Sequence, residues 1–213
     1  MWEELTTPWK ICFEEAWEAY CKGSIPIGAV LVDEQDNIIS RGRNRIHETN
    51  APLKQTCGNK LAHAEINVLM QVSKETTMRN STLYTTTEPC ILCFGAIVMC
   101  NVGRVRYAAS DLLAGGSNLN KSNNTFIEQR LIDIKQCDQK RLGEFQRVLR
   151  TDYILRNLNK VKAQKMLEDD SKDYPEAVDL GEHWFKINKL EHAKQNGEHI
   201  SNIINEIVQE LNK

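Results

Sequence analysis

The sequence of 213 residues lacks the features that mark membrane-spanning and exported proteins. No apolar run approaches the length of about 20 residues that a transmembrane helix needs. The first ten residues, MWEELTTPWK, contain neither the charged region nor the apolar segment of a signal peptide. We therefore expect no membrane partner and a cytoplasmic location.

A large excess of charge is also absent. The 27 Lys and Arg residues face 29 Asp and Glu residues, for a net charge of -2. The chain has no overall positive charge that would attract nucleic acid, but the sequence does not exclude a local basic patch. Two groups of arginines offer one: Arg41, Arg43 and Arg45, and Arg104 and Arg106. We favour the simpler interpretation that they are solvated side chains on strand surfaces.

The seven cysteines are not accompanied by any export signal. Cysteines of a reducing compartment are small buried side chains, metal ligands or redox groups rather than a disulfide framework. An internal repeat is missing as well. The hydrophobic content of 41% is ordinary for a globular domain, so one domain with a substantial core, or a domain plus a helical appendage, is expected.

Residue periodicity predicts an amphipathic helix from Thr7-Pro8 to just before Gly23. Residues 25–33 and 38–44 read as two strands of a hairpin. Strands are expected at 81–87 and 104–110. One helix is expected at HAE, before the first of these strands, and another at CILCFGAIVMC, between the two. This alternation over residues 60–110 predicts a largely parallel sheet covered on both faces.

The pattern weakens after residue 111. We expect a Gly- and Asn-rich loop, then a charged helix over much of 138–167, and an acidic, turn-prone stretch at 168–182. The last helix carries an apolar stripe of isoleucines around residues 200–211. Either the main domain or a second subunit must cover that stripe.

Four residues stand out in the stretches LAHAEINVL and TTTEPCILC: His63, Glu65, Cys90 and Cys93. Each alone has a simpler explanation, such as a structural histidine or a helix-start glutamate. A C-x-x-C pair also suits a redox site or half of a four-cysteine zinc site. A redox site would have its C-x-x-C after the first strand of the domain, which is not the case here. A four-cysteine zinc site would need a second C-x-x-C, and the sequence has none. Cys57 and Cys100 are interpreted as core or loop cysteines.

The combination indicates more than its parts. One His and two Cys leave tetrahedral zinc one open position, which is typical of catalytic zinc sites. Water there becomes acidic, and a carboxylate two residues from the histidine can move its protons. The pattern H-x-E…P-C-x-x-C is typical of zinc deaminases of nucleobases. We predict one Zn²⁺ per chain. The same ligands are also compatible with iron.

The likeness extends beyond these four residues. The stretches PIGAVLVDEQDNIISRGRNR, AHAEINVL and STLYTTTEPCILCFGAIVMCNVGRVRYAASD resemble the cytidine-deaminase-like superfamily, most closely the branch of tRNA adenosine deaminases and guanine or cytosine deaminases. The resemblance, over roughly residues 8–120, implies a three-layer α/β/α sandwich around a central five-stranded mixed sheet. We expect a deaminase domain at 1–150 and a helical C-terminal extension at 151–213.

The resemblance also implies the roles of individual residues. His63, Cys90 and Cys93 would bind zinc, and Glu65 would be the catalytic proton shuttle. Asn44 matches an asparagine that faces the target base, and Asp111 matches a position near the sugar or backbone of the substrate. The simpler interpretations are a strand-end turn residue for Asn44 and a cap or loop residue for Asp111.

Three functions are weighed for the chain. The leading expectation is a zinc-dependent hydrolytic deaminase of a free nucleobase or nucleoside, with the C-terminal extension closing over the pocket. The alternative is a tRNA-specific adenosine deaminase, although the aromatic–arginine cluster at the end of bacterial members is not found here. The third is a non-catalytic, zinc-stabilised binding protein, against which Glu65 argues. By resemblance, a homodimer is expected.

Overall fold

A computed structural model describes all residues 1–213. Its centre is a five-stranded sheet in the order β2-β1-β3-β4-β5. Strands β1 (Gly28–Val32) and β2 (Ile38–Arg43) pair antiparallel as the predicted hairpin, and β1 also pairs antiparallel with β3 (Thr82–Thr87). Strands β3, β4 (Arg104–Ala109) and β5 (Asp133–Gln136) run parallel. The sheet is therefore mixed, and parallel only in the half that follows β1.

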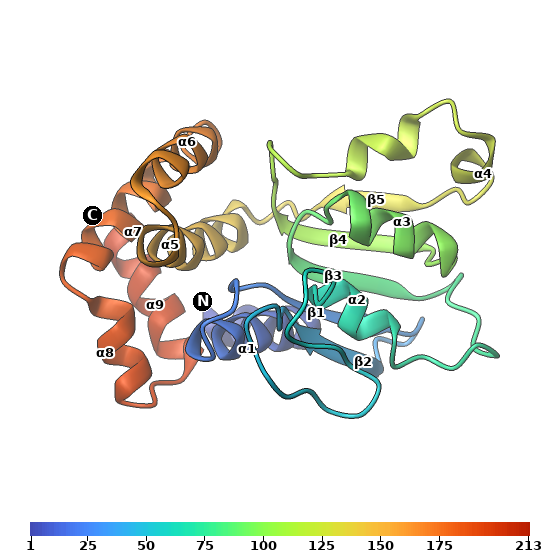
Figure 1. Cartoon of the computed structure of the whole chain (residues 1–213), viewed down its shortest axis with the longest axis horizontal. Helices are drawn as coiled ribbons and strands as arrows, with labels where there is room; N and C mark the ends of the chain where they lie inside the picture. Colours follow the sequence, from blue (N-terminus) through green and yellow to red (C-terminus); the bar gives the residue numbers. More distant parts are fainter.

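Helices cover both faces of this sheet, which confirms the three-layer α/β/α fold (Figure 1). Helices α1 (Thr7–Cys21) and α5 (Lys140–Asn157) pack on one face. Helices α2 (Ala64–Leu69) and α3 (Ile91–Met99) pack on the other. Short helical turns η1 (Trp2–Glu4), η2 (Ser117–Lys121) and α4 (Thr125–Glu128) complete the layers.

Strand β1 explains why two cores form. Successive strand side chains point to opposite faces. Val30 and Val32 join the cluster beneath α1 and α5, whereas Ala29 and Leu31 join the cluster beneath α2 and α3. All five residues of the strand are buried, as expected of a central strand covered on both sides.

The limits of α1 agree with the sequence prediction. Pro8 lies in its first turn, where a missing N–H costs nothing. Gly23 follows the last turn with φ +78°. This left-handed conformation is one that glycine adopts without strain.

The C-terminal helices α6 (Lys160–Asp170), α7 (Pro175–Lys186), α8 (Lys189–Gln195) and α9 (Ile200–Leu211) lie together beside α5 (Figure 1). Two predictions for this region were wrong. The single charged helix over 138–167 is two helices, because Asn159 caps α6 by accepting a hydrogen bond from the Lys162 N–H at 3.0 Å. The stretch at 168–182, expected to be turn-prone, contains most of α7.

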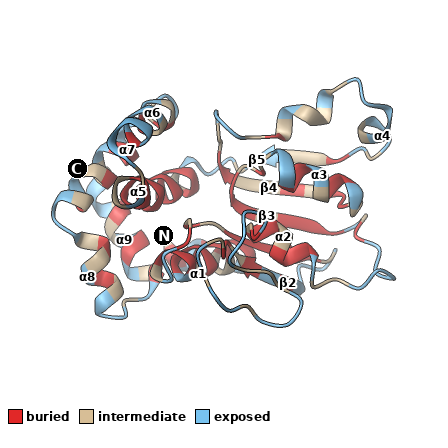
Figure 2. Ribbon diagram, in the orientation of Figure 1, coloured by how far each residue is buried: buried red, intermediate tan, exposed pale blue.

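The apolar stripe of α9 is covered within the chain. Ile203, Ile204 and Ile207 are at most 1% exposed and belong to the same cluster as side chains of α1 and α5. Figure 2 shows that α5 is buried along most of its length. The predicted division at residues 150 and 151 falls inside this continuous helix. None of the helices is both long and apolar enough to cross a bilayer.

Because α9 shares its core with α1 and α5, we expect Ile204→Ala to destabilise the whole chain. Ile204 is fully buried, and such truncations cost about 2–5 kcal/mol. Urea unfolding of the metal-free protein followed by tryptophan fluorescence and by far-UV circular dichroism should give one coincident transition, shifted to lower urea.

The matched control is Val161→Ala in α6, a side chain that is 80% exposed and should change stability by less than about 0.5 kcal/mol. Two separate transitions, with only one of them moved by Ile204→Ala, would contradict a shared core and support an independently folded extension.

Candidate metal centre

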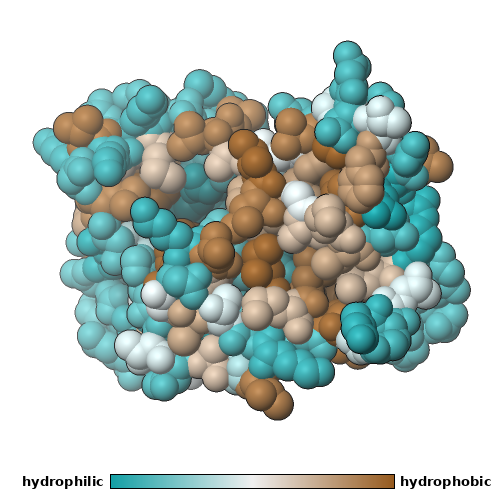
Figure 3. All heavy atoms as spheres, turned by 45° about the vertical axis from the view of Figure 1, so that its right-hand side comes forward, coloured by the Kyte–Doolittle hydropathy of each residue, from teal (hydrophilic) through white to brown (hydrophobic).

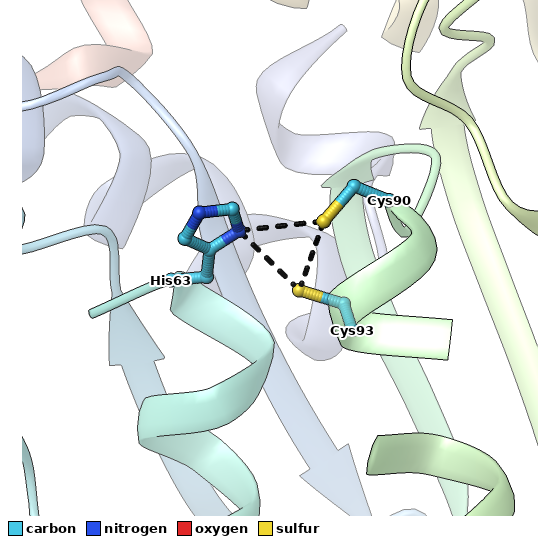
Figure 4. A group of neighbouring side chains, drawn as sticks. All are labelled: His63, Cys90 and Cys93. Carbon is cyan, nitrogen blue, oxygen red and sulfur yellow. Dashed lines mark hydrogen bonds between the residues drawn. The ribbon is translucent and has the colours of Figure 1, made fainter. Parts of the chain in front are cut away.

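The predicted metal ligands meet at the N-terminal ends of two helices. His63 is the N-cap residue of α2, and Cys90 is the N-cap residue of α3, which follows directly from β3 through Pro89. Cys93 lies one turn into α3 and is fully buried. Figure 4 shows the imidazole of His63 facing both sulfur atoms across the gap between the helices.

The three donor atoms have the spacing of a tetrahedral zinc site. Nδ1 of His63 lies 3.5 Å from each sulfur, and the two sulfurs are 3.7 Å apart. Zinc bonds of about 2.0–2.1 Å to nitrogen and about 2.3 Å to sulfur, at tetrahedral angles, require separations of about 3.6 and about 3.8 Å. His63, Cys90 and Cys93 thus form a potential zinc site whose donor spacing needs little rearrangement.

The electrostatics of the cluster favour metal binding. The hydrogen bond from the Cys93 thiol, followed by that from His63, lowers the pKa of Cys90 to about 4, although burial opposes the shift. Cys90 is therefore a thiolate at neutral pH, which is the form that binds metal. Its place at the start of α3 adds the favourable end of the helix dipole.

Glu65 lies next to these ligands and is only 3% exposed. Its Oε1 accepts a hydrogen bond from the Thr85 hydroxyl at 3.1 Å, and its Oε2 lies 3.2 Å from the Cys93 sulfur. Burial is the main cause that raises the pKa of this carboxyl. A carboxylate whose proton affinity is raised by burial can take up a proton and return it, which suits a general acid–base role.

A cavity of about 370 Å³ opens onto this cluster. His63, Glu65 and Cys90 line its metal end, and most of the remaining lining is apolar, including Ile27 and Ile46. A groove of about 760 Å³ between α5, α6 and α7 is larger, but no His or Cys lines it. The smaller cavity is the candidate substrate site because the reactive groups converge there.

Asn44 is 1% exposed and lies where the chain leaves β2. Its side-chain oxygen accepts a hydrogen bond from the Ile46 N–H at 3.2 Å, which agrees with a turn residue. Its Nδ2 has no partner in the protein. Buried donors without a partner are costly. Ile46, two residues further on, lines the cavity, but Asn44 is not among the lining residues, so its contact with a substrate stays a prediction.

Asp111 lines the cavity, and most of its hydrogen-bonding capacity is already used. Its Oδ1 accepts from the N–H groups of Leu113 and Ala114, and its Oδ2 lies 3.1 Å from Nη1 of Arg150. Although burial works in the opposite direction, Arg150 and these N–H groups lower the pKa of Asp111. The loop interpretation of this residue is thus correct, and its contact with a substrate stays a prediction.

Glu88, which precedes Pro89, fastens the loop after β4 beside the metal cluster. Its carboxylate accepts hydrogen bonds from the N–H groups of Asp111 and Ser117 at 2.9 and 3.2 Å. A Cβ at Gly115 would lie 2.4 Å from that carboxylate, so only glycine fits there. Sequence reasoning assigned no role to Glu88, although its place next to the PCILC motif was a usable signal.

Helices α5 and α6 complete the cavity with Arg150, Tyr153, Ile154, Leu158 and Met166. None of these residues was predicted at the site. The first four share a helical face at i, i+3, i+4 and i+8, but this spacing by itself gave no indication of which side of the helix meets the cavity. Of the helices α6 to α9, only α6 contributes to the cavity lining, through Met166, so closure of the whole extension over the pocket stays a prediction.

The arginines that might form an RNA-binding patch are largely paired with carboxylates. Arg43 pairs with Glu48 at 3.0 Å and with Glu15 at 3.5 Å. Arg45 also pairs with Glu48, and Arg41 pairs with Glu15 at 2.6 Å. On β4, Arg106 pairs with Asp133 at 2.6 Å. Their charges are therefore mostly offset inside the chain, rather than held as freely solvated side chains.

Comparison with protein families gives a match over residues 3–109. The matching family model is described as the cytidine and deoxycytidylate deaminase zinc-binding region. It includes the helices and strands that carry His63, Glu65, Cys90 and Cys93, and it ends at the last residue of β4. Helices α5 to α9 lie outside the matched range.

Similar curated proteins are bacterial tRNA-specific adenosine deaminases. That of Haemophilus influenzae is 36% identical over 148 residues, which cover 65% of this chain and 81% of the relative. That of Aquifex aeolicus is 33% identical over 110 residues, covering 50% of this chain and 67% of the relative.

Solved structures agree on the fold. One comes from a study of A-to-I editing by tRNA:A34 deaminases at the wobble position. It has a TM-score of 0.51 and 27% identity, covering 60% of this chain and 95% of that chain. A guanine deaminase from Nitrosomonas europaea has a TM-score of 0.50 and 21% identity, covering 68% of this chain and 82% of that chain, and is similar in fold alone.

We expect Cys90→Ser to reduce the zinc content of the purified protein well below the one ion per chain expected of the parent. Serine is a far poorer zinc ligand than a thiolate, and the remaining two ligands hold the ion weakly. Metal content is measured by mass spectrometry after dialysis against buffer without chelator.

The control is Cys100→Ser, which alters a half-buried cysteine just after the C-terminal end of α3 and should leave the zinc content unchanged. Equal zinc in parent and Cys90→Ser protein would remove Cys90 from the ligand set.

Proposed function

Because this chain belongs to the family of the cytidine and deoxycytidylate deaminase zinc-binding region, we propose that it converts adenosine in tRNA to inosine by hydrolysis. The chain is a zinc-dependent deaminase that acts on a C–N bond. The observation that carries the reaction is the three-ligand cluster beside the buried Glu65. The choice of adenosine in tRNA rests on the relatives, which favour it over the leading expectation of a free base or nucleoside.

His63, Cys90 and Cys93 would hold the ion, and Glu65 would move the protons. When bound, zinc makes water acidic enough to act as a nucleophile near neutral pH. Glu65 accepts a proton from that water and passes it to the ring nitrogen of the base. It then transfers the second proton to the departing amine. The water oxygen would form a bond to the ring carbon that carries the amine, and the C–N bond would break. The two water protons then end on the ring nitrogen and on ammonia, and the ring keeps a carbonyl oxygen.

Thr85 and Asn44 would orient the participants. The Thr85 hydroxyl donates to Oε1 of Glu65, which leaves Oε2 as the oxygen nearer to the cysteine ligands. The unpartnered Nδ2 of Asn44 is a donor that an acceptor atom on the base edge would satisfy. Asp111 would border the substrate together with Arg150, its ion-pair partner.

A free nucleoside or nucleobase is the second candidate, and one observation favours it. Side chains of α5 and α6 line the cavity that holds the metal cluster, and Arg41, Arg43 and Arg45 are paired with Glu15 and Glu48. RNA binding needs clustered cations that neutralise phosphates. A small substrate needs no such cations and gains from an apolar enclosure.

The third expectation, a zinc-stabilised binding protein, has the least support. A structural zinc site has no use for a buried carboxyl with a raised pKa beside its ligands. We propose a cytoplasmic location for the protein, whether its substrate is tRNA or a free nucleoside or base.

We also propose a homodimer through the exposed face of α3. Ile91 and Met99 are 67% and 69% exposed on this face, and Leu112 and Leu113 of the loop after β4 are 55% and 57% exposed. Figure 3 shows hydrophobic residues gathered in a band across the middle of one side of the molecule. An uncharged apolar face can pack against its own copy about a two-fold axis without repulsion.

For the substrate, we expect zinc-loaded protein to form inosine in an anticodon stem-loop that carries adenosine at the wobble position. Adenosine, adenine, guanine, cytidine and cytosine are tested in parallel, with ammonia and the deaminated base measured by chromatography. Turnover of a free nucleoside or base without turnover of the stem-loop would replace the leading proposal with the second candidate.

With the substrate so identified, Glu65→Gln should lower kcat by about 10²–10⁴-fold, because the amide accepts no proton. Zinc content should be unchanged, since Glu65 is not a ligand. Glu75→Gln, at an exposed carboxylate in the loop after α2, is the control and should keep full activity. Full activity of the Glu65→Gln protein would show that Glu65 is not the proton shuttle.

For the assembly, light scattering of the zinc-loaded protein should give the mass of two chains. The double substitution Ile91→Glu with Met99→Glu should give the mass of one, because like charges would face each other across the two-fold axis. Leu53→Glu changes a side chain that is 90% exposed in another loop and should leave the dimer intact. A monomeric parent protein would contradict the proposal.

A further inference from the structure

Helix α5 presents two polar side chains to the otherwise apolar far wall of the substrate cavity. Arg150 and Tyr153 are three residues apart, so they lie on the same face of the helix. Ile154 and Leu158 continue that face and also line the cavity. Neither polar side chain is needed to bind the metal or to move protons at Glu65.

Arg150 is the only Lys or Arg among the residues that line this cavity. It is 6% exposed, and two carboxylates from different segments hold its guanidinium. Nη1 lies 3.1 Å from Oδ2 of Asp111, and Nε lies 3.0 Å from Oδ2 of Asp170. Its Nη2 makes no hydrogen bond with the protein and is not fully buried, so it is available to donate to a ligand in the cavity that Arg150 lines.

Tyr153 likewise offers a polar atom that makes no hydrogen bond with the protein and is not fully buried. It is also 6% exposed, and the hydrogen bond it makes is through its backbone carbonyl, which accepts from the Asn157 side chain at 2.9 Å. Its hydroxyl has no partner in the protein. Burial raises the pKa of this phenol, so the hydroxyl keeps its proton and can both donate and accept.

The charge around Arg150 decides which kind of oxygen fits. Asp111 lines the same cavity, and with Asp170 it offsets the charge of Arg150, while Arg147 lies 3.4 Å from Asp170. Two arginines and two aspartates leave this cluster neutral. A phosphate dianion would meet the Asp111 carboxylate at close range, whereas neutral hydroxyl groups can donate to Asp111 and accept from Arg150 and Tyr153.

The metal cluster determines the orientation of the ligand. The amine that is removed must lie at His63, Cys90 and Glu65, so side chains from another element contact the part of the substrate that is not reacting. The cavity volume of about 370 Å³ is within the range of about 300–1,000 Å³ that holds ligands larger than a single ring system. A base with an attached sugar matches both the size and the polar groups.

We propose that Arg150 and Tyr153 are specificity-determining residues that bind the hydroxyl groups of a ribose. The substrate is then a nucleoside, free or within RNA, and not a free base. This inference rests on the proposed deaminase function and adds the sugar to the recognised part of the substrate.

The test is calorimetric binding to zinc-loaded Glu65→Gln protein, which holds a ligand without converting it. Three pairs are titrated: adenosine and adenine, guanosine and guanine, and cytidine and cytosine. Within the pair that binds, we expect the nucleoside to bind more tightly than its base, and adenosine 5′-monophosphate to gain nothing over adenosine.

Two substitutions are then added to that protein. Tyr153→Phe should raise the Kd of the nucleoside about 2–10-fold and Arg150→Lys about 10–100-fold, the range for neutral and charged hydrogen bonds, while the Kd of the matching base changes less than about twofold. The 2′-deoxynucleoside should lose less than the ribonucleoside does, because it has one hydroxyl fewer to lose.

Matched controls separate recognition from folding. Arg147→Lys alters the same ionic cluster from a side chain that is 1% exposed and does not line the cavity. Tyr174→Phe removes a hydroxyl that accepts from Gln136 at 2.6 Å outside the cavity. Both should leave the ratio of nucleoside to base affinity unchanged.

The outcomes distinguish this inference from the proposed function. Equal losses for nucleoside and base in the Arg150 and Tyr153 variants, or no binding of any of the six ligands, would overturn ribose recognition. Tighter binding of the 5′-monophosphate would replace the hydroxyl groups with a phosphate as the recognised group. Ribose-dependent binding together with absent turnover by the unsubstituted enzyme would keep this inference and reject the proposed reaction.

Discussion

The structure depends on one constraint: the sheet holds the starts of two helices so close that an imidazole and two sulfurs meet at 3.5–3.7 Å. His63 and Cys90 are 27 residues apart in sequence, and each is an N-cap residue. Strand β3 leads into α3, which packs on the same face of the sheet as α2. Three residues arranged in this way would hold a zinc ion, and the Glu65 carboxyl lies next to them.

The burial of charge links this centre to the C-terminal helices. Buried carboxylates and guanidinium groups are tolerated only when they are paired. Asp111 after β4, Arg147 and Arg150 on α5, and Asp170 at the end of α6 satisfy one another across three segments. Helix α5 consequently packs on the sheet and also lines the cavity. Residues beyond the matched family region therefore take part in forming the site.

The reaction and the choice of substrate depend on different parts of the cavity. The reaction is determined by a few atoms at the metal end of the cavity, all of which lie within the matched residues 3–109. The identity of the substrate depends on the far wall, which comes from α5 and α6. An apolar enclosure strengthens polar interactions with a bound base.

The sequence by itself determined the local elements and the reactive set. The start of α1 at Thr7-Pro8 and the His63, Glu65, Cys90 and Cys93 pattern depend on neighbouring residues, whose spacing is visible along the chain. Strand β5 was not identified, because DIKQ in Asp133–Gln136 has no apolar run, and α7 is hidden in an acidic stretch. Only the tertiary structure decided that Arg150 and Tyr153 face the metal cavity, because the side of α5 that meets the site depends on packing between segments far apart in sequence.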